Sequence, residues 1–214
     1  MAALAVVLLL CQITLADDSR MLSTLQRYGG SPETFRGWRQ LIEDSRLLET
    51  QDKLRRVNAF FNRKIQFLYD DFQIWGQTDY WATPLETLAK GRGDCEDFTI
   101  AKYFTLLSAG MPNEQLRLIY VKARIGGPSS KVTQAHMVLA YYPTPDAEPL
   151  LLDSLITEIR PASRRPDLQP MFSFNSMGIW ANPAAGGEPG RTGVGRLTRW
   201  QDLLNRAKAE GFDF

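Results

Sequence analysis

The spacing of apolar residues changes near position 112, from the period of a helix to that of a strand, and this change constrains the fold most strongly. Before it, apolar side chains recur every three or four residues, as in amphipathic helices. After it, they alternate over residues 116–125 and 133–142, and a short apolar segment follows at residues 150–153. Short connections between such strands favour an antiparallel meander. Helices followed by strands predict an α+β fold, with N-terminal helices packed on an antiparallel sheet, rather than an α/β fold.

The N-terminal half carries local signals for helices. Ser31 is a suitable N-cap, and Pro32 occupies the first position of the helix that follows. Two apolar stripes with helical spacing come next, at Phe35, Trp38, Leu41 and Ile42 and at Leu54, Val57 and Phe61. Thr83 and Pro84 begin a further short helical turn. We therefore expect at least three helices before position 92.

The best-defined helix is predicted from about Cys95 to Ala109. Asp94 is its N-cap, Gly110 lies where a left-handed C-cap is needed, and Pro112 prevents the helix from continuing. Its buried face is predicted at Ile100, Phe104 and Leu107.

Length and composition indicate one globular domain. The chain has 214 residues, of which 44% are hydrophobic and 23% charged, and these values exclude a disordered chain. We expect a single domain over residues 17–214, with a Gly/Pro-rich loop at residues 183–195 before a C-terminal helix. The formal net charge of +1 provides no basic stripe for nucleic acid, so no nucleic-acid partner is expected.

Residues 1–16 are uncharged and rich in Ala, Val and Leu, and they end in Thr14-Leu15-Ala16, small residues where a signal peptidase cleaves. The segment lacks a basic start, and it is shorter than the roughly 20 residues of a membrane span. We predict a signal peptide, export, and no membrane insertion once it is removed. Cys95 is then the one cysteine left, because Cys11 lies in the removed segment, and no internal disulfide can form.

Cys95 lies where the sequence can activate a thiol. In the first turn of a helix, unpaired N–H groups and the helix dipole stabilise a thiolate. The same N–H groups can donate hydrogen bonds to an oxyanion. A proton donor would have to be His136, the one histidine of the chain, and Asp153 on the next strand could orient its ring. Each residue also has an alternative interpretation without catalysis. Cys95 could be a small buried residue, His136 a histidine packed in the protein, and Asp153 an acid that ends a strand.

Three acidic residues, Asp94, Glu96 and Asp97, surround this thiol. They can cap the helix and complement its dipole. Three negative charges would, however, raise the pKa of the thiol and oppose the effect of the helix. A divalent cation bound to their oxygens would remove this conflict, and calcium accepts irregular oxygen shells. The spacing alone does not decide whether these acids cap the helix or bind a metal.

Several segments resemble the bacterial transglutaminase-like cysteine proteinases. Residues 93–98, Gly-Asp-Cys-Glu-Asp-Phe, together with residues 101–103, resemble the nucleophile helix of that family. Residues 135–139 and 152–154 are similar to its His and Asp strands, and residues 80–86 to the segment before its cysteine. The resemblance covers about residues 30–180. It implies a papain-like α+β fold with the catalytic residues Cys95, His136 and Asp153.

The resemblance also implies a cofactor, a location and partners. It implies calcium (Ca²⁺) bound through the acidic residues Asp94, Glu96 and Asp97, and a periplasmic location. The implied substrate is a large repeat adhesin, cut at a paired-alanine site, whose release promotes biofilm dispersal. The implied inhibitor is an inner-membrane receptor for cyclic di-GMP, a nucleotide that this chain is not expected to bind itself. Trp81 is a candidate partner contact, because tryptophan is enriched in interface hot spots, and its alternative is core packing.

Two other functions remain possible from the sequence. A transglutaminase-type acyl transferase would use the same triad, with an amine in place of water. A non-enzymic binding protein would have a calcium-stabilised loop and an inert Cys95.

Overall fold

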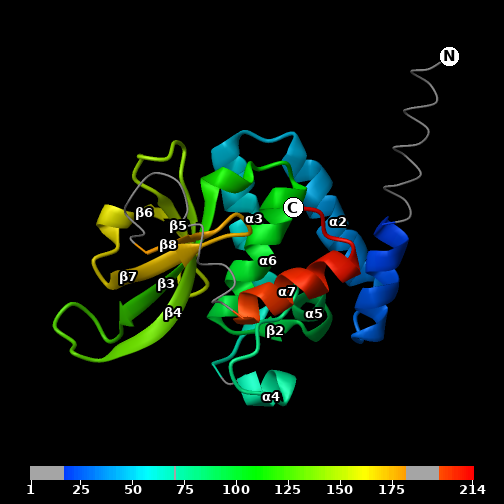
Figure 1. The fold of residues 1–214 in the computed structure, drawn as a ribbon, viewed down its shortest axis with the longest axis horizontal. Helices are drawn as coiled ribbons and strands as arrows, with labels where there is room; N and C mark the ends of the chain where they lie inside the picture. The colour runs from blue at the N-terminus through cyan, green and yellow to red at the C-terminus, as the bar shows by residue number, and fades with distance from the viewer. Residues whose placement is uncertain (1–16, 70, 182–197) are drawn as a thin grey trace.

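The computed structural model describes residues 17–69, 71–181 and 198–214. The predicted signal peptide and the predicted Gly/Pro-rich loop therefore lie outside the described residues. Helices gather on one side of the molecule and the larger sheet on the other, with α6 between them (Figure 1). The predicted α+β class is confirmed. Within the described ranges, no helix combines the length and the apolar character that a membrane span needs.

The predicted helices are present in the predicted order, and the helix at residues 17–27 and the short helix α4 were not predicted. After a helix at residues 17–27 come α2 (Pro32–Arg46), α3 (Thr50–Lys64), α4 (Asp71–Trp75), α5 (Pro84–Lys90), α6 (Cys95–Ser108) and α7 (Thr198–Glu210). The Ser31 hydroxyl accepts from the Thr34 N–H at 3.1 Å, as expected of an N-cap. The predicted stripes are buried in α2 and α3, and the predicted C-terminal helix is present as α7, with Trp200, Leu203, Leu204 and Ala207 buried.

Helix α6 is the central helix of the domain. Its predicted limits are confirmed, and Gly110 adopts a φ of 82°, the left-handed conformation that glycine favours. The predicted single buried face is wrong, since burial extends around most of the helix and includes Lys102, whereas Leu107 is only half-buried. The reason is tertiary, because α6 contacts α3, α5, β3 and β4.

Two sheets are present among the described residues. Their strands are β1 (Gln66–Phe67), β2 (Arg92–Gly93), β3 (Leu116–Arg124), β4 (Thr133–Tyr141), β5 (Leu150–Leu152), β6 (Arg160–Pro161), β7 (Leu168–Phe174) and β8 (Ile179–Trp180). Strands β1 and β2 form a parallel pair, and the rest form an antiparallel sheet in the order β6-β5-β4-β3-β7-β8. The predicted meander is confirmed as β3-β4-β5, whereas β7, on the other side of β3, was not predicted.

The larger sheet separates two apolar cores. Along β4, Met137 and Leu139 join the core that contains α6, whereas Val138 and Ala140 join a smaller core on the opposite face. This alternation follows from the period of two along a strand. The candidate histidine lies within β4, and the candidate acid, Asp153, directly follows the neighbouring strand β5.

Trp81 lies in the core on the helix side of the sheet. It is 6% exposed, and its ring stacks on Phe174 with centroids 5.7 Å apart and meets Trp200 edge-on at 6.5 Å. The structure therefore corrects its assignment as a partner contact in favour of core packing. The sequence could not reveal this, because the covering rings come from β7 and α7, both far away along the chain.

Candidate active site

The segment before α6 is shaped by a capping box. The Asp94 carboxylate accepts from the N–H groups of Glu96 at 3.0 Å and Asp97 at 3.1 Å, and the Asp97 carboxylate accepts from the Asp94 N–H at 3.3 Å. Gly93 permits this closure, since a Cβ there would lie 2.7 Å from that of Asp97. The motif thus fixes Cys95 at the first position of the helix.

The thiol of Cys95 is buried beside an acid. Its sulfur donates to Glu96 Oε2 at 2.6 Å and accepts a hydrogen bond from the backbone of Met137, the residue after His136 on β4. Burial raises the pKa of the thiol well above its usual value, and the charges of Glu96 and Asp94 raise it further. The acidic neighbours that the sequence predicts to oppose the helix dipole are therefore present, and they add to the effect of burial.

His136 and Asp153 form a buried pair. Nε2 of His136 lies 2.8 Å from Oδ1 of Asp153, and the two residues are 3% and 0% exposed. The pairing of β4 with β5 brings them together, because Asp153 directly follows β5. With Nε2 held by the acid, Nδ1 is the ring nitrogen left for proton transfer, as a cysteine nucleophile requires.

Asp153 is held ionised. Burial alone would raise the pKa of Asp153, but the hydrogen bond and charge of His136, the Leu155 N–H and the charge of Arg165 hold it well below its usual range. Nη1 of Arg165 lies 2.8 Å from Oδ2 of Asp153. Sequence reasoning missed Arg165, because nothing in its spacing distinguishes it from the other arginines.

A second group of carboxylates lies at the start of α6. Oxygen atoms of Asp71, Asp94 and Asp97 lie within 4.8 Å of one another, as do ligand atoms of Asp94, Cys95 and Glu96. Burial and the neighbouring acids raise the pKa of Asp94 to about 10 and, despite several N–H donors, that of Asp97 to about 8. Asp71 was missed from the sequence, where its position in an irregular aromatic segment gave no indication of its neighbours.

These carboxylates differ in how much of their bonding capacity the protein uses. Asp97 accepts from Ala82 N–H at 2.9 Å and from Trp75 Nε1 at 3.1 Å in addition to Asp94 N–H, so the capping interpretation holds for it. By contrast, Oδ1 of Asp71 is buried with no partner among the described residues. A hard cation that binds oxygen fits this donor set. Asp71 and Asp94 have more oxygen lone pairs left for such a cation than Asp97, because fewer hydrogen bonds occupy their carboxylates.

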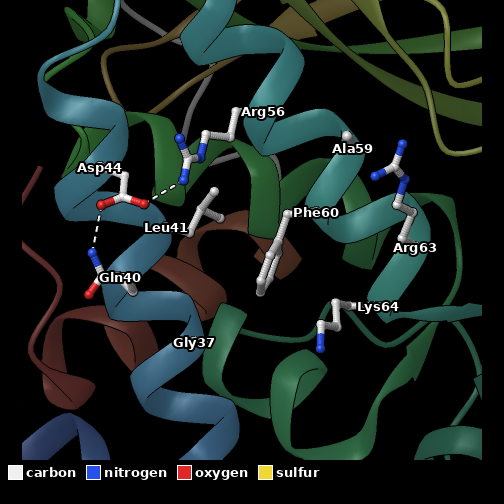
Figure 2. Close-up of a pocket in the computed structure, with 9 residues that line it drawn as sticks. All are labelled: Gly37, Gln40, Leu41, Asp44, Arg56, Ala59, Phe60, Arg63 and Lys64. Carbon is white, nitrogen blue, oxygen red and sulfur yellow. Dashed lines mark hydrogen bonds and ion pairs between the residues drawn. The ribbon is translucent and has the colours of Figure 1, made fainter.

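A groove elsewhere on the surface is not part of this site. Figure 2 shows it between α2 and α3, where Asp44 is hydrogen-bonded to Gln40 and Arg56, with Arg63 and Lys64 at the opposite end. Its volume is about 380 Å³, and none of the predicted site residues lines it.

The chain belongs to the bacterial transglutaminase-like cysteine proteinases. The model of that family matches residues 40–166, a range that includes the candidate nucleophile, histidine and acid. The fold and the family together define the chain as a member of a cysteine peptidase family.

Solved structures of one relative are similar over most of the chain. Calcium-bound LapG from Legionella pneumophila has 40% sequence identity and a TM-score of 0.73, covering 88% of this chain and 98% of that one. EGTA-treated LapG from the same organism has 38% identity and a TM-score of 0.73, covering 88% and 96%. A comparison with curated proteins found no match.

Proposed function

We propose that this chain is a calcium-dependent periplasmic cysteine endopeptidase. Its substrate is a large repeat adhesin (LapA-like), cut at a paired-alanine site, and release of the adhesin promotes biofilm dispersal. The observation that carries the proposal is the buried His136–Asp153 pair, in which His136 precedes Met137, the residue whose backbone hydrogen-bonds Cys95, in a chain of this peptidase family.

Each member of the triad has one task. His136 takes the proton of the Cys95 thiol through Nδ1, and the thiolate attacks the carbonyl carbon of the scissile bond. The imidazolium, held by Asp153, then donates its proton to the departing amine, and water hydrolyses the thioester.

The oxyanion meets a donor at the start of α6. The N–H groups of Glu96, Asp97 and Phe98 already have acceptors within the described part of the chain. The Cys95 N–H is therefore the first-turn group that can donate to the developing negative charge.

Calcium is assigned to the carboxylates that precede and begin α6. Asp71, Asp94 and Glu96 would hold it, with Asp97 as the buried support of the loop. When bound, the ion supplies the positive charge that allows these acids to remain ionised together. The calcium-bound and EGTA-treated LapG structures support calcium as the ion.

The remaining partner is a proposal from family resemblance. An inner-membrane cyclic di-GMP receptor (LapD-like) would sequester the peptidase. The nucleotide would bind the receptor and not this chain.

Cleavage of a purified adhesin fragment tests the proposal. We expect cleavage by the wild type and none above background by Cys95→Ala. EGTA should abolish cleavage, excess calcium should restore it, and replacement of the paired alanines by bulky residues should protect the fragment. Cleavage by Cys95→Ala would contradict the assigned nucleophile.

Two further measurements separate the alternative functions. Incorporation of an added amine as the main product would indicate an acyl transferase rather than a peptidase. Failure of iodoacetamide to alkylate Cys95 in the presence of calcium would indicate an inert thiol and a binding protein.

A further inference from the structure

We propose that Arg165 is a positioning residue of this site, which holds the Asp153 carboxylate in the one orientation that orders the His136 ring. The inference rests on the proposed function, since it assigns Asp153 to the triad. It concerns a residue that lies after β6, outside the segments that carry the family resemblance.

The guanidinium of Arg165 joins two carboxylates. Nη1 donates to Oδ2 of Asp153 at 2.8 Å. Nε donates to Oδ1 of Asp167 at 3.0 Å, and Nη2 donates to Oδ2 of Asp167 at 2.8 Å. Arg165 is 6% exposed, so the guanidinium is fixed at both ends in a largely buried position. A planar fork of this kind defines direction as well as charge.

The backbone of Asp153 is fixed independently. Its carbonyl oxygen accepts from Lys102 Nζ at 3.0 Å and from Asn62 Nδ2 at 2.9 Å. The freedom that remains is rotation of the side chain about its Cα–Cβ and Cβ–Cγ bonds.

The two oxygens of that carboxylate have different partners. Oδ1 faces His136 and also accepts from the Leu155 N–H at 3.0 Å. Oδ2 accepts from Arg165, and no second donor to Oδ2 lies within the described ranges. Arg165 is therefore the contact that distinguishes Oδ2 from Oδ1. Without it, the carboxylate could turn, and the ring could lose the bond that selects the Nε2–H tautomer.

The surroundings make this contact difficult to replace. Arg165 borders a cavity of about 170 Å³ on the face of the sheet opposite α6, among apolar side chains such as Val138, Leu151 and Leu168. An apolar lining offers few partners to a bridging water. A neutral side chain at position 165 would remove the cationic partner of the buried Asp153 carboxylate and leave it only the bonds to His136 and the Leu155 N–H.

Kinetics give the first test. We expect Arg165→Gln to reduce kcat about 100-fold with little change in KM, since Arg165 is buried and acts through its bond to Asp153. Arg165→Lys should give an intermediate loss, because one ammonium cannot bind Asp153 and Asp167 in the same forked geometry. Arg164→Gln is the matched control, an exposed neighbour that should retain wild-type kcat.

NMR gives a readout that a purely structural role would not change. His136 is the one histidine of the chain, so ¹⁵N-histidine labelling reports a single ring. With the ring neutral, the wild type and Arg164→Gln should show the Nε2–H tautomer, and Arg165→Gln a mixture of tautomers. A single Nε2–H tautomer with wild-type kcat in either Arg165 variant would overturn the proposal. If Arg165→Gln does not fold, the lysine variant decides by the same criteria.

The triad and the role of Arg165 can fail separately. If Asp153→Asn and Cys95→Ala abolish cleavage but the Arg165 variants do not reduce it, only the role of Arg165 is wrong. If Cys95→Ala cleaves normally, the proposed function is wrong, and the NMR measurement still reports whether Arg165 orders the ring.

Discussion

Asp153 is a buried carboxylate and Asp94 a half-buried one, and the protein surrounds the two in opposite ways. Asp153 lies between Arg165 and His136, and its pKa is held far below the usual range despite its burial. Asp94 lies among Asp71, Glu96 and Asp97, and burial together with their charges raises its pKa to about 10. None of the ion pairs of the described residues involves Asp71, Asp94 or Asp97.

The difference shows which charges the chain balances by itself. The Asp153 cluster contains its own cationic partner, so it is complete in the folded chain. The Asp94 cluster contains only acids, so like charges are brought close together at a burial cost. The proposed calcium would supply there what Arg165 supplies at Asp153.

Replacing each acid by asparagine gives the largest expected effects, with opposite signs. Asp153→Asn removes the charge from a buried pair with Arg165 and should lower the free energy of unfolding by about 3 kcal/mol. Asp94→Asn keeps an acceptor for the N-cap and removes an acid that must take up a proton on folding at this pH, because its pKa rises to about 10, so without calcium the variant should be more stable by at least about 1 kcal/mol. Urea unfolding in EGTA at pH 7.5 measures both changes.

Asp44→Asn is a control in which an acid that binds Arg56 near the surface is replaced, and it should change stability by less than about 1 kcal/mol. If Asp94→Asn in EGTA destabilises the protein as much as Asp153→Asn does, the proposed contrast between the two clusters is wrong.

The sequence predicted the parts of the fold that depend on local signals. Ser31, Asp94 and Gly110 define helix ends through hydrogen bonds and backbone conformations within a few residues, so α2 and α6 could be placed accurately. Strand β7 could not be found in this way. It contains Pro170 and pairs with β3 across a register shift near Tyr120, so it is defined by a partner about 50 residues earlier.

The same distinction applies to the candidate site. Cys95 and His136 stood out because each is rare in the chain and lies on a recognisable element. Asp71 and Arg165 matter because of which residues they meet in space, and both belong to residue types that are common on surfaces. Local sequence contains no information on such contacts, and the burial that changes their chemistry is a property of the folded chain.

Calcium should produce the next largest effect, at the Asp94 cluster alone. At a calcium concentration one hundred times the dissociation constant, the wild type should gain about 2.7 kcal/mol in free energy of unfolding. Asp71→Asn should reduce this gain because it removes a charged oxygen ligand. Calorimetric titration and unfolding in calcium or EGTA measure the two quantities.

Asp79→Asn is the matched control, since Asp79 is exposed, pairs with Arg199 and lies outside the cluster. Its calcium response should equal that of the wild type. Equal stability of the wild type in calcium and EGTA would exclude a calcium site in this cluster.

Glu210 is a third buried carboxylate, intermediate between these extremes, and gives the smallest expected effect. Its Oε1 accepts from Tyr28 and Thr83, both at 2.9 Å, and its Oε2 is buried without a partner among the described residues. Burial raises its pKa from 4.5 to about 7, although both hydroxyl donors oppose the shift. Because the folded state holds the proton more tightly, the stabilisation is complete below pH 4.5 and is lost as the pH rises to about 7.

Glu210→Gln should therefore remove this part of the pH dependence and stabilise the protein by about 2 kcal/mol at pH 8. Urea unfolding from pH 5 to pH 8, at constant calcium, gives the difference between variant and wild type at each pH. Glu114→Gln, at an exposed position, should show no such difference. A constant difference between the Glu210 variant and the wild type across this range would mean that neutral hydroxyl donors suffice to keep a buried carboxylate ionised. Hydrogen bonds from neutral donors would then be enough to explain why Asp153 is ionised, without the charge of Arg165.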